Sequence, residues 1–382
     1  MKLVALRGQI VTDYEVWYEG TLLLSEGSIA DVSPDDSLVD AADEVHDHGE
    51  SLILPGFVDL QVNGAFGVDV ASESSRLAEL SEALLSTGTT SYLPTVISSP
   101  EDLYEEALPA IGSLHGSGAE VLGVHLEGPF ISVQKKGVHA AAHLARPDAE
   151  LLARLLDLGP VRMITLAPEL EGADDLISLA ANRGVVVSAG HSAVAFEPAY
   201  DALDGQVAGV THLFNAMSAM HHREPGLPGA AFAHPRAVCG LIADGLHVHP
   251  EMVGLAYRML GPDRLCLVTD AISATGMEDG EYRLATRTVY ADGGVPRLGS
   301  GTIAGGVLTM REAFMNILAF TGCTVAEAVR MTSTSPAKLV GEGRRKGRLA
   351  PGYEADVTVL KPDLSVERVW RGGKLVYSLE GE

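Results

Sequence analysis

The stretch LILPGFVDLQVNG, residues 52–64, joins an apolar strand to a group of polar side chains. Residues 52–60 are almost entirely apolar, which is typical of a strand that is buried on both faces of a sheet. Asp59, Gln61 and Asn63 come at the end of this run. The stretch therefore indicates a buried strand that presents polar groups at its C-terminal end.

Seven more apolar runs follow, and helical patterns separate most of them. Three of these patterns, at 77–88, 148–159 and 173–184, end on a glycine that would cap the helix. Alternating apolar strands and helices indicate a parallel sheet, and eight such units favour a closed (β/α)8 TIM barrel over an open doubly wound sheet. The active site of such a barrel lies at the C-terminal ends of the strands. The seven further runs are 90–97, 120–127, 161–167, 184–190, 208–214, 237–243 and 264–270.

The residue pattern at both ends of the chain differs from that in the middle. Residues 1–50 and 355–379 read as short strands punctuated by Gly and Asp turns. We therefore expect the two termini to meet in a small β-sandwich domain. The predicted division is residues 1–53 and 349–382 for the β-sandwich, and residues 54–348 for the barrel.

Composition and charge exclude several classes of partner. The chain has 382 residues, 46% of them hydrophobic, yet no apolar run reaches the roughly 18 residues that a membrane helix requires. The formal net charge of -24 argues against nucleic acid as a partner, although it leaves room for a phosphorylated small molecule. The N-terminus lacks a signal-peptide pattern, and three widely spaced cysteines indicate reduced thiols, so we expect a cytoplasmic protein.

Polar side chains follow several of the later strands as well. Two imidazoles and a carboxylate suit a catalytic Zn²⁺-like site that keeps one position open for water. Such a metal lowers the pKa of bound water toward roughly 7, and an opposing aspartate can take the proton and later deliver it to a leaving group. The residue types therefore predict metal-assisted hydrolysis. The side chains concerned are Glu127, His191, His212, Asp244, His247 and Asp270.

A more specific resemblance rests on seven motifs. The chain is similar to the N-acetylglucosamine-6-phosphate deacetylase family of the amidohydrolase superfamily. The motifs stand in that family's order and extend over nearly the whole chain: PGFVDLQVNG, HLEGPF…KKGVH, AGHS, THLFNAM, REPGLPGA, ADGLHV and LVTDAI. The resemblance implies a homodimer with a TIM barrel and a β-sandwich. It also implies hydrolysis of the acetamide of N-acetyl-D-glucosamine 6-phosphate to D-glucosamine 6-phosphate and acetate.

The resemblance also implies a role for individual residues. Glu127, His191 and His212 would hold the metal, and Asp270 would act first as base and then as acid. His139 would hydrogen-bond the substrate near its acetamide and help to polarise it. The substrate-binding positions that it implies are Gln61, Val138, His139, Asn215, Ala216, Arg223, His247, Ile303, Ala304 and Gly305.

The resemblance assigns some of these positions to the phosphate of the substrate. The Asn215–Ala216 backbone and His247 would bind the sugar phosphate, and Arg223 would reach into the neighbouring subunit's site to complete the phosphate clamp. Residues 300–306 read SGTIAGG where many relatives carry a polar SGS, so contacts there would be mainly apolar or through the backbone. Lys135 and Lys136 read as solvated charges, with a place near the pocket entrance as the functional alternative.

Gln61 and Asn63 stand where many metal-dependent hydrolases carry His-x-His. Neutral amides are weak ligands for Zn²⁺, so we expect one divalent metal per subunit. Zn²⁺ is favoured, while Fe²⁺, Co²⁺ or Mn²⁺ would also suit the ligand set. Three alternatives stay open: a deacetylase for the galactosamine epimer, another amidohydrolase, and an inactive relative that serves as a binding protein. The last would be expected to have lost its ligands, which are all present here.

Overall fold

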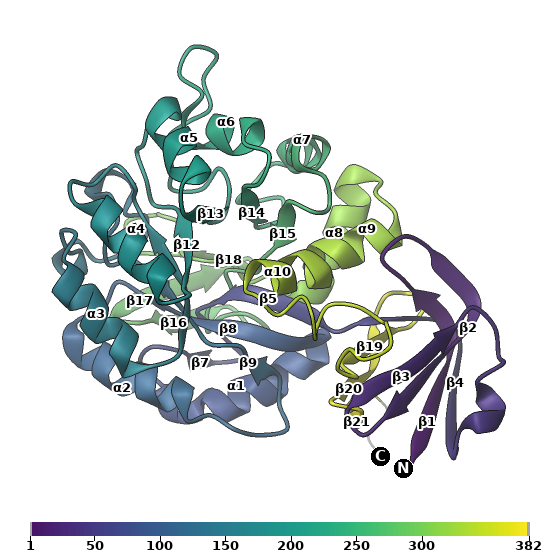
Figure 1. Ribbon diagram of the computed structural model, residues 1–382. Coiled ribbons are helices and arrows are strands. Elements are labelled where there is room, and N and C mark those ends of the chain that lie inside the picture. Colours follow the sequence, from purple (N-terminus) through teal and green to yellow (C-terminus); the bar gives the residue numbers. More distant parts are fainter. Residues whose placement is uncertain (1, 380–382) are drawn as a thin grey trace.

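The computed structural model describes residues 2–379 and has two main parts (Figure 1). One part is a barrel of parallel strands wrapped by helices. The other is a sheet to which both ends of the chain contribute, and the two ends lie close together in Figure 1. The predicted fold class is confirmed.

The barrel consists of eight parallel strands that pair in chain order. A bridge between Val62 and Ala271 connects the first strand to the segment after the last one, and the backbone N–H of Asn63 donates to the carbonyl of Ala271 at 2.8 Å. These contacts link the two edges of the sheet and nearly close the barrel. The strands are β5 (Phe57–Val62), β8 (Thr89–Ile97), β10 (Val124–Glu127), β11 (Val161–Leu166), β12 (Val186–Ala189), β13 (Val207–Val210), β14 (Val238–Leu241) and β15 (Leu265–Leu267); β9 (Glu120–Val121) pairs with β8.

Helices cover the outside of the barrel (Figure 1). Gly88 and Gly184 have left-handed φ angles of 79° and 74°, as expected for glycines that end helices. Gly159 differs, because its φ of -165° is extended; an added Cβ there would lie 2.6 Å from the carbonyl oxygen of Leu108. The helices are α1 (Leu77–Leu84), α2 (Glu101–Gly112), α3 (Ala149–Leu158), α4 (Ala173–Asn182), α5 (Phe196–Asp204), α6 (Gly226–Ala233), α7 (Pro250–Leu260), α8 (Met310–Thr321), α9 (Val325–Val329) and α10 (Ser335–Leu339).

The terminal sheet has seven strands in the order β21-β20-β19-β4-β1-β2-β3. Its own hydrophobic core includes Leu6, Ile53 and Trp370. Because β4 pairs with β19, the N-terminal and C-terminal segments form one unit, while the domain boundaries themselves stay a prediction. The strands are β1 (Leu3–Val11), β2 (Val16–Ser25), β3 (Ser28–Ser33), β4 (Glu44–Pro55), β19 (Val357–Leu360), β20 (Val366–Arg371) and β21 (Lys374–Ser378).

A charged cluster joins the barrel to the terminal sheet. The ammonium of Lys346 lies 2.7 Å from carboxylate oxygens of Glu120 and Glu354, and 2.5 Å from Asp356. The Lys346 side chain is only 1% exposed. Since Glu120 belongs to β9 and Asp356 directly precedes β19, this buried lysine ties the two parts together.

Two small sheets were not predicted from the sequence. One is the hairpin of β6 (Gly64–Ala65) and β7 (Val68–Asp69). The other is a three-stranded sheet of β16 (Gly280–Leu284), β17 (Arg287–Asp292) and β18 (Val295–Arg297). A bridge joins Arg297 to Ile303, so this second sheet supports the segment 300–306. Across residues 2–379, no helix has the length and apolar character needed to cross a membrane.

Candidate active site

The backbone at the C-terminal ends of three barrel strands turns sharply. His191, His212 and Asp270 have φ angles of 47°, 32° and 50°, in the left-handed region that non-glycine residues rarely adopt. Such a conformation costs roughly 1–3 kcal/mol per residue and is concentrated at functional sites. The three residues that carry this strain were all predicted from the sequence to do chemistry.

The three predicted metal ligands converge on one point. The Oε1 atom of Glu127 and the Nε2 atoms of His191 and His212 lie 3.0 Å from one another, and all three residues are buried. The Nδ1 atom of His191 lies 2.8 Å from the carbonyl oxygen of Lys135. Because a carbonyl can only accept, Nδ1 carries the proton and Nε2 keeps its lone pair, which is the tautomer that binds a metal.

This spacing and this donor set fit a divalent metal. Three electron-pair donors that face one another repel unless a cation lies among them, and 3.0 Å separations suit ligands at about 2.0–2.2 Å from one ion. Burial by itself raises the pKa of Glu127, but hydrogen bonding and positive charge at the point where His191 and His212 face it hold that pKa well below its ordinary value. The Glu127 carboxylate therefore requires a positive partner, which a divalent metal provides.

His139 lies beside this set, and it too is close enough to be considered as a ligand. Glu127, His139 and His191 form a group with metal-site spacing, although Nε2 of His139 is 4.0 Å from Oε2 of Glu127. The backbone N–H of Ser98 donates to Nδ1 of His139 at 3.2 Å, which places the proton of the neutral ring on Nε2. Burial and then the charge of His191 lower the pKa of His139 to about 3, so the ring is neutral. Its Nε2–H, which has no partner within residues 2–379, suits a substrate oxygen better than a metal.

Asp270 faces the metal set across the pocket and is held by two amides. Asn63 donates to Oδ1 of Asp270 at 2.7 Å, and Gln61 donates to the same oxygen at 3.1 Å. Gln61 also donates to Oε1 of Glu127 at 3.1 Å. Burial, followed by the charge of Glu127, raises the pKa of Asp270 to about 6. A carboxyl group with such a pKa can take up and return a proton near neutral pH.

His247 is oriented by a neighbouring carboxylate. Its Nδ1–H donates to Oδ2 of Asp244 at 2.6 Å, while the backbone N–H groups of Leu246 and His247 both donate to Oδ1 at 2.8 Å. Burial raises the pKa of Asp244, but the His247 hydrogen bond and charge outweigh it and lower that pKa overall. The ring is thereby fixed with Nε2 free to face a ligand.

A pocket of about 410 Å³ brings most of the predicted residues together. Gln61 lies behind the lining, in contact with Glu127 and Asp270, and Ala304 is buried without lining the pocket. Arg223 is exposed in the loop before α6, which projects at the top of Figure 1, and it does not line the pocket of its own chain. The predicted residues that line the pocket are Glu127, Val138, His139, His191, His212, Asn215, Ala216, His247, Asp270, Ile303 and Gly305.

Sequence reasoning missed part of the pocket wall. Lys135 had been considered for the pocket entrance, and the spacing of the KKGVH motif could have placed Gln134 and Gly137 near His139 as well. The sequence gives no sign that the apolar residues of the pocket wall line a pocket, because their pattern is that of ordinary core residues. Asn63 and Thr302 also line the pocket, and they belong to the polar strand end and to the 300–306 segment that were singled out from the sequence. The lining residues without such a prediction are Ile97, Gln134, Gly137, Ile242, Leu246 and Leu284.

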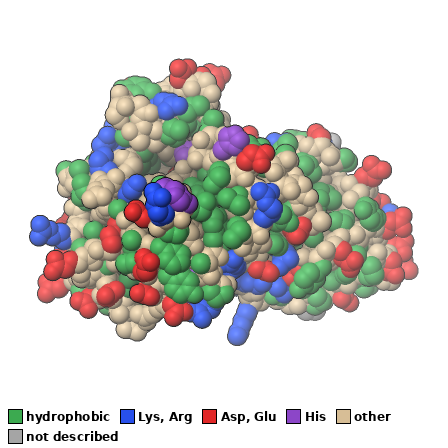
Figure 2. Space-filling model, turned by 90° about the horizontal axis from the view of Figure 1, so that it is seen from above, with side chains coloured by type: hydrophobic (Ala, Val, Ile, Leu, Met, Phe, Trp, Pro, Cys, Tyr) green, Lys and Arg blue, Asp and Glu red, His purple; other side chains and the backbone are tan. Residues whose placement is uncertain are grey.

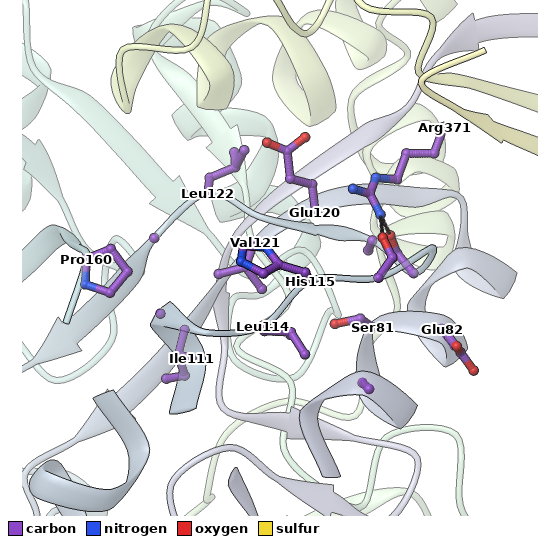
Figure 3. Close-up of a pocket in the computed structure, with 16 residues that line it drawn as sticks. Ser81, Glu82, Ile111, Leu114, His115, Glu120, Val121, Leu122, Pro160 and Arg371 are labelled. Atoms are coloured by element: carbon purple, nitrogen blue, oxygen red, sulfur yellow. Dashed lines mark hydrogen bonds between the residues drawn. The ribbon is translucent and has the colours of Figure 1, made fainter. Parts of the chain in front are cut away.

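A larger cavity of about 520 Å³ lies elsewhere, between α1, the segment after α2 and the end of β20 (Figure 3). None of the predicted site residues lines it. Arg371 donates to the carbonyls of Gly116 and Gly118, and Glu120 pairs with Arg345 at 2.7 Å. Arg371 and Glu120 are thus already paired, and the cavity holds none of the converging Glu and His side chains found around Glu127. The pocket around Glu127 is the candidate active site.

Comparisons with known proteins show the family. The amidohydrolase family model matches residues 52–376. N-acetylglucosamine-6-phosphate deacetylase from Bos taurus is 40% identical over 89% of this chain and 87% of its own. N-acetylgalactosamine-6-phosphate deacetylase from Escherichia coli O157:H7 is 36% identical over 97% of this chain and 98% of its own.

A solved structure extends the similarity to three dimensions. It is an N-acetyl-D-glucosamine-6-phosphate deacetylase from Mycobacterium smegmatis in complex with N-acetyl-D-glucosamine-6-phosphate. It aligns with a TM-score of 0.91 at 31% identity over 99% of each chain. The chain belongs to the amidohydrolase family, and its resemblance to the N-acetylglucosamine-6-phosphate deacetylases is confirmed.

Proposed function

We propose that this protein hydrolyses the acetamide of N-acetyl-D-glucosamine 6-phosphate to D-glucosamine 6-phosphate and acetate. The observation that carries the proposal is the convergence of Glu127, His191 and His212 at 3.0 Å, inside a pocket that Asp270 also lines. The names of the similar deacetylases support the choice of substrate. A pocket of about 410 Å³ also falls within the range of small-molecule sites.

The roles in this reaction follow from the hydrogen bonds of each residue. One divalent metal held by Glu127, His191 and His212, with Zn²⁺ as the first choice, would polarise the substrate carbonyl and acidify the attacking water. Asp270 takes the proton from that water and returns it to the departing amine. His139 donates its Nε2–H toward the acetamide oxygen, because its Nδ1 is occupied by Ser98.

The phosphate end of the substrate would lie on the other side of the pocket. His247 offers Nε2, and the backbone of Asn215 and Ala216 lines the same wall. Arg223 is exposed and outside its own pocket, which is consistent with a homodimer in which it completes the partner subunit's site. Figure 2 shows hydrophobic side chains beside a group of Lys, Arg and His side chains on the upper face. Val133, Met220 and Leu246 are exposed hydrophobic residues that a second subunit would cover.

A second candidate substrate is the galactosamine epimer. The similarity to N-acetylgalactosamine-6-phosphate deacetylase from Escherichia coli O157:H7 favours it as the alternative. The two sugars differ in the orientation of one hydroxyl, so the proposed chemistry at Asp270 is the same for both. Comparing kcat/KM for the two phosphorylated sugars distinguishes them, and we expect the glucosamine compound to be preferred.

The direct test is acetate release by purified protein loaded in turn with Zn²⁺, Fe²⁺, Co²⁺ or Mn²⁺. We expect turnover of N-acetyl-D-glucosamine 6-phosphate and a much lower kcat/KM for unphosphorylated N-acetylglucosamine. Absence of acetate release with every metal and both epimers would refute the proposed function. The cytoplasmic location remains a prediction from the sequence.

A further inference from the structure

We infer that Lys135 is the cation that this chain itself contributes to the phosphate of its substrate. The inference rests on the proposed function, because it requires a phosphorylated substrate. Among the described residues that line the 410 Å³ pocket, Lys135 is the only lysine or arginine. Arg223, the other expected cation, does not line the pocket of its own chain. A single subunit therefore presents one fixed positive charge to its ligand.

The pocket needs such a charge. Glu127, Asp244 and Asp270 lie in or beside it, and the whole chain has a formal net charge of -24. The ring of His247 is already paired with Asp244. The proposed metal would offset charge at the Glu127 end of the pocket, so a phosphate dianion still depends on a further cation such as a nearby ammonium for its affinity.

Lys135 lies on the same side of the pocket as the expected phosphate-binding turn. The N–H of Ser132 donates to the carbonyl of His191 at 2.9 Å, and the N–H of Ser192 donates to the carbonyl of Ala216 at 3.2 Å. A Cβ built on Gly137 would lie 3.8 Å from the Cβ of Ala216. The segment that carries Lys135 is therefore packed against the Ala216 turn, with His191 between them.

The backbone of Lys135 is fixed, while its charge is available. Its N–H donates to the carbonyl of Ser132 at 3.0 Å, and its carbonyl accepts from Nδ1 of His191 at 2.8 Å. Within residues 2–379 its ammonium has neither a hydrogen-bond nor an ion-pair partner, and the residue is half-buried. An anchored residue with an unpaired ammonium at the pocket is suited to bind an oxyanion of the ligand.

The adjacent lysine is a matched control. Lys136 belongs to the same loop and is half-buried to a similar degree, but it does not line the pocket. Its ammonium lies 3.4 Å from the carbonyl of Gly137. Replacing Lys136 removes the same charge from the chain without removing it from the pocket wall.

The test compares Lys135→Met, Lys135→Arg and Lys136→Met in the metal-loaded full chain. For Lys135→Met we expect KM for N-acetyl-D-glucosamine 6-phosphate to rise roughly ten- to hundredfold. The ratio of its kcat/KM to that of unphosphorylated N-acetylglucosamine should fall by a similar factor. Calorimetry with D-glucosamine 6-phosphate should show the same loss without turnover. Lys135→Arg should restore most of the affinity, and Lys136→Met should change KM less than threefold.

An unchanged KM in Lys135→Met would overturn the inference, and so would equal losses for Lys135→Met and Lys136→Met. An equal loss for the phosphorylated and unphosphorylated sugars would also overturn it, since that pattern indicates a general structural effect. Metal content and thermal midpoint of each variant separate misfolding from lost binding. Failure of the wild-type protein to release acetate would instead refute the proposed function, so the two failures are distinguishable.

Discussion

The side-chain amide of Gln61 donates a hydrogen bond of 3.1 Å to Oε1 of Glu127, the carboxylate of the proposed metal set. The same nitrogen lies 3.1 Å from Oδ1 of Asp270. One neutral amide thus bridges two carboxylates that would otherwise repel each other in a buried pocket. A second cation could lie between these two carboxylate oxygens, and the amide of Gln61 occupies that position instead. The arrangement supports a single-metal site.

Replacing Gln61 with glutamate should therefore create affinity for a second divalent ion. Gln61→Glu would place a third carboxylate beside Glu127 and Asp270, and hard or borderline cations bind such clusters. We expect the variant to take up close to two metal ions per subunit at high metal concentration, and the control Gln61→Met to take up one. Metal analysis after gel filtration provides the count. If both variants bound the same number of metal ions per subunit, Gln61 would not control binding of a second metal.

Asp270→Asn should abolish hydrolysis while leaving the metal in place. The amide cannot accept the proton from water or return one to the amine, so we expect kcat to fall about 10²- to 10⁴-fold. Glu127, His191 and His212 are untouched, so metal content should equal that of the wild-type protein. Acetate release and elemental analysis on the same sample test both statements. If Asp270→Asn kept more than a tenth of the wild-type activity, Asp270 would not be the general base and acid.

Asn63→Ala should shift the pH dependence of the reaction. The Asn63 hydrogen bond lowers the pKa of Asp270, which burial and Glu127 raise to about 6. Losing that bond raises the pKa further, and the base must be ionised, so the acid limb of kcat/KM should move to higher pH. We expect the loss at pH 5.5 to exceed that at pH 8 by about three- to tenfold. A loss that is uniform across this range would contradict the assignment.

Lys346→Met should destabilise the joint between the barrel and the terminal sheet. It leaves Glu120, Glu354 and Asp356 without their shared ammonium, which for a buried charged group costs about 3–5 kcal/mol in the free energy of unfolding. Chemical denaturation measures this cost. The control Lys338→Met replaces an exposed lysine and should change the free energy of unfolding by less than about 0.5 kcal/mol.

The same cluster has a defined pH dependence. Burial lowers the pKa of Lys346, but Asp356 and Glu120 outweigh it and raise the pKa above 10.5. The stability that this lysine contributes is therefore present below 10.5 and lost as the pH rises through its folded value. Lys346 contributes to the lowered pKa of Glu120, so in Lys346→Met this carboxylate binds a proton more readily when folded, and the deficit should shrink between pH 8 and pH 4.5. A deficit that grows on acidification would contradict this account.

Much of the barrel could be predicted because its strands are buried on both faces. Each of the eight apolar runs overlaps a barrel strand, from β5 to β15. The first run, 52–60, spans the end of β4 and the start of β5, since both are apolar and only Gly56 separates them. The sheet β16–β18 was missed, although the Gly293–Gly294 turn between alternating residues was a usable hairpin signal.

The site could be predicted only in part, for a physical reason. Glu127, His191, His212 and Asp270 are reactive residue types at strand ends, where a barrel gathers its chemistry. Pocket residues such as Ile97 and Leu284 are apolar, and nothing in their residue type distinguishes them from core residues. Arg223 illustrates a further limit, because a residue proposed to act in a partner subunit would have no geometric relation to its own chain's pocket.

One metal ion, held by Glu127, His191 and His212, should be sufficient for activity. The most direct test is titration of metal-depleted protein with Zn²⁺ while acetate release from N-acetyl-D-glucosamine 6-phosphate is measured. We expect activity to rise linearly and to reach its plateau at one equivalent per subunit, with one bound ion by elemental analysis. A plateau at two equivalents, with two ions bound in each active subunit, would contradict the single-metal site.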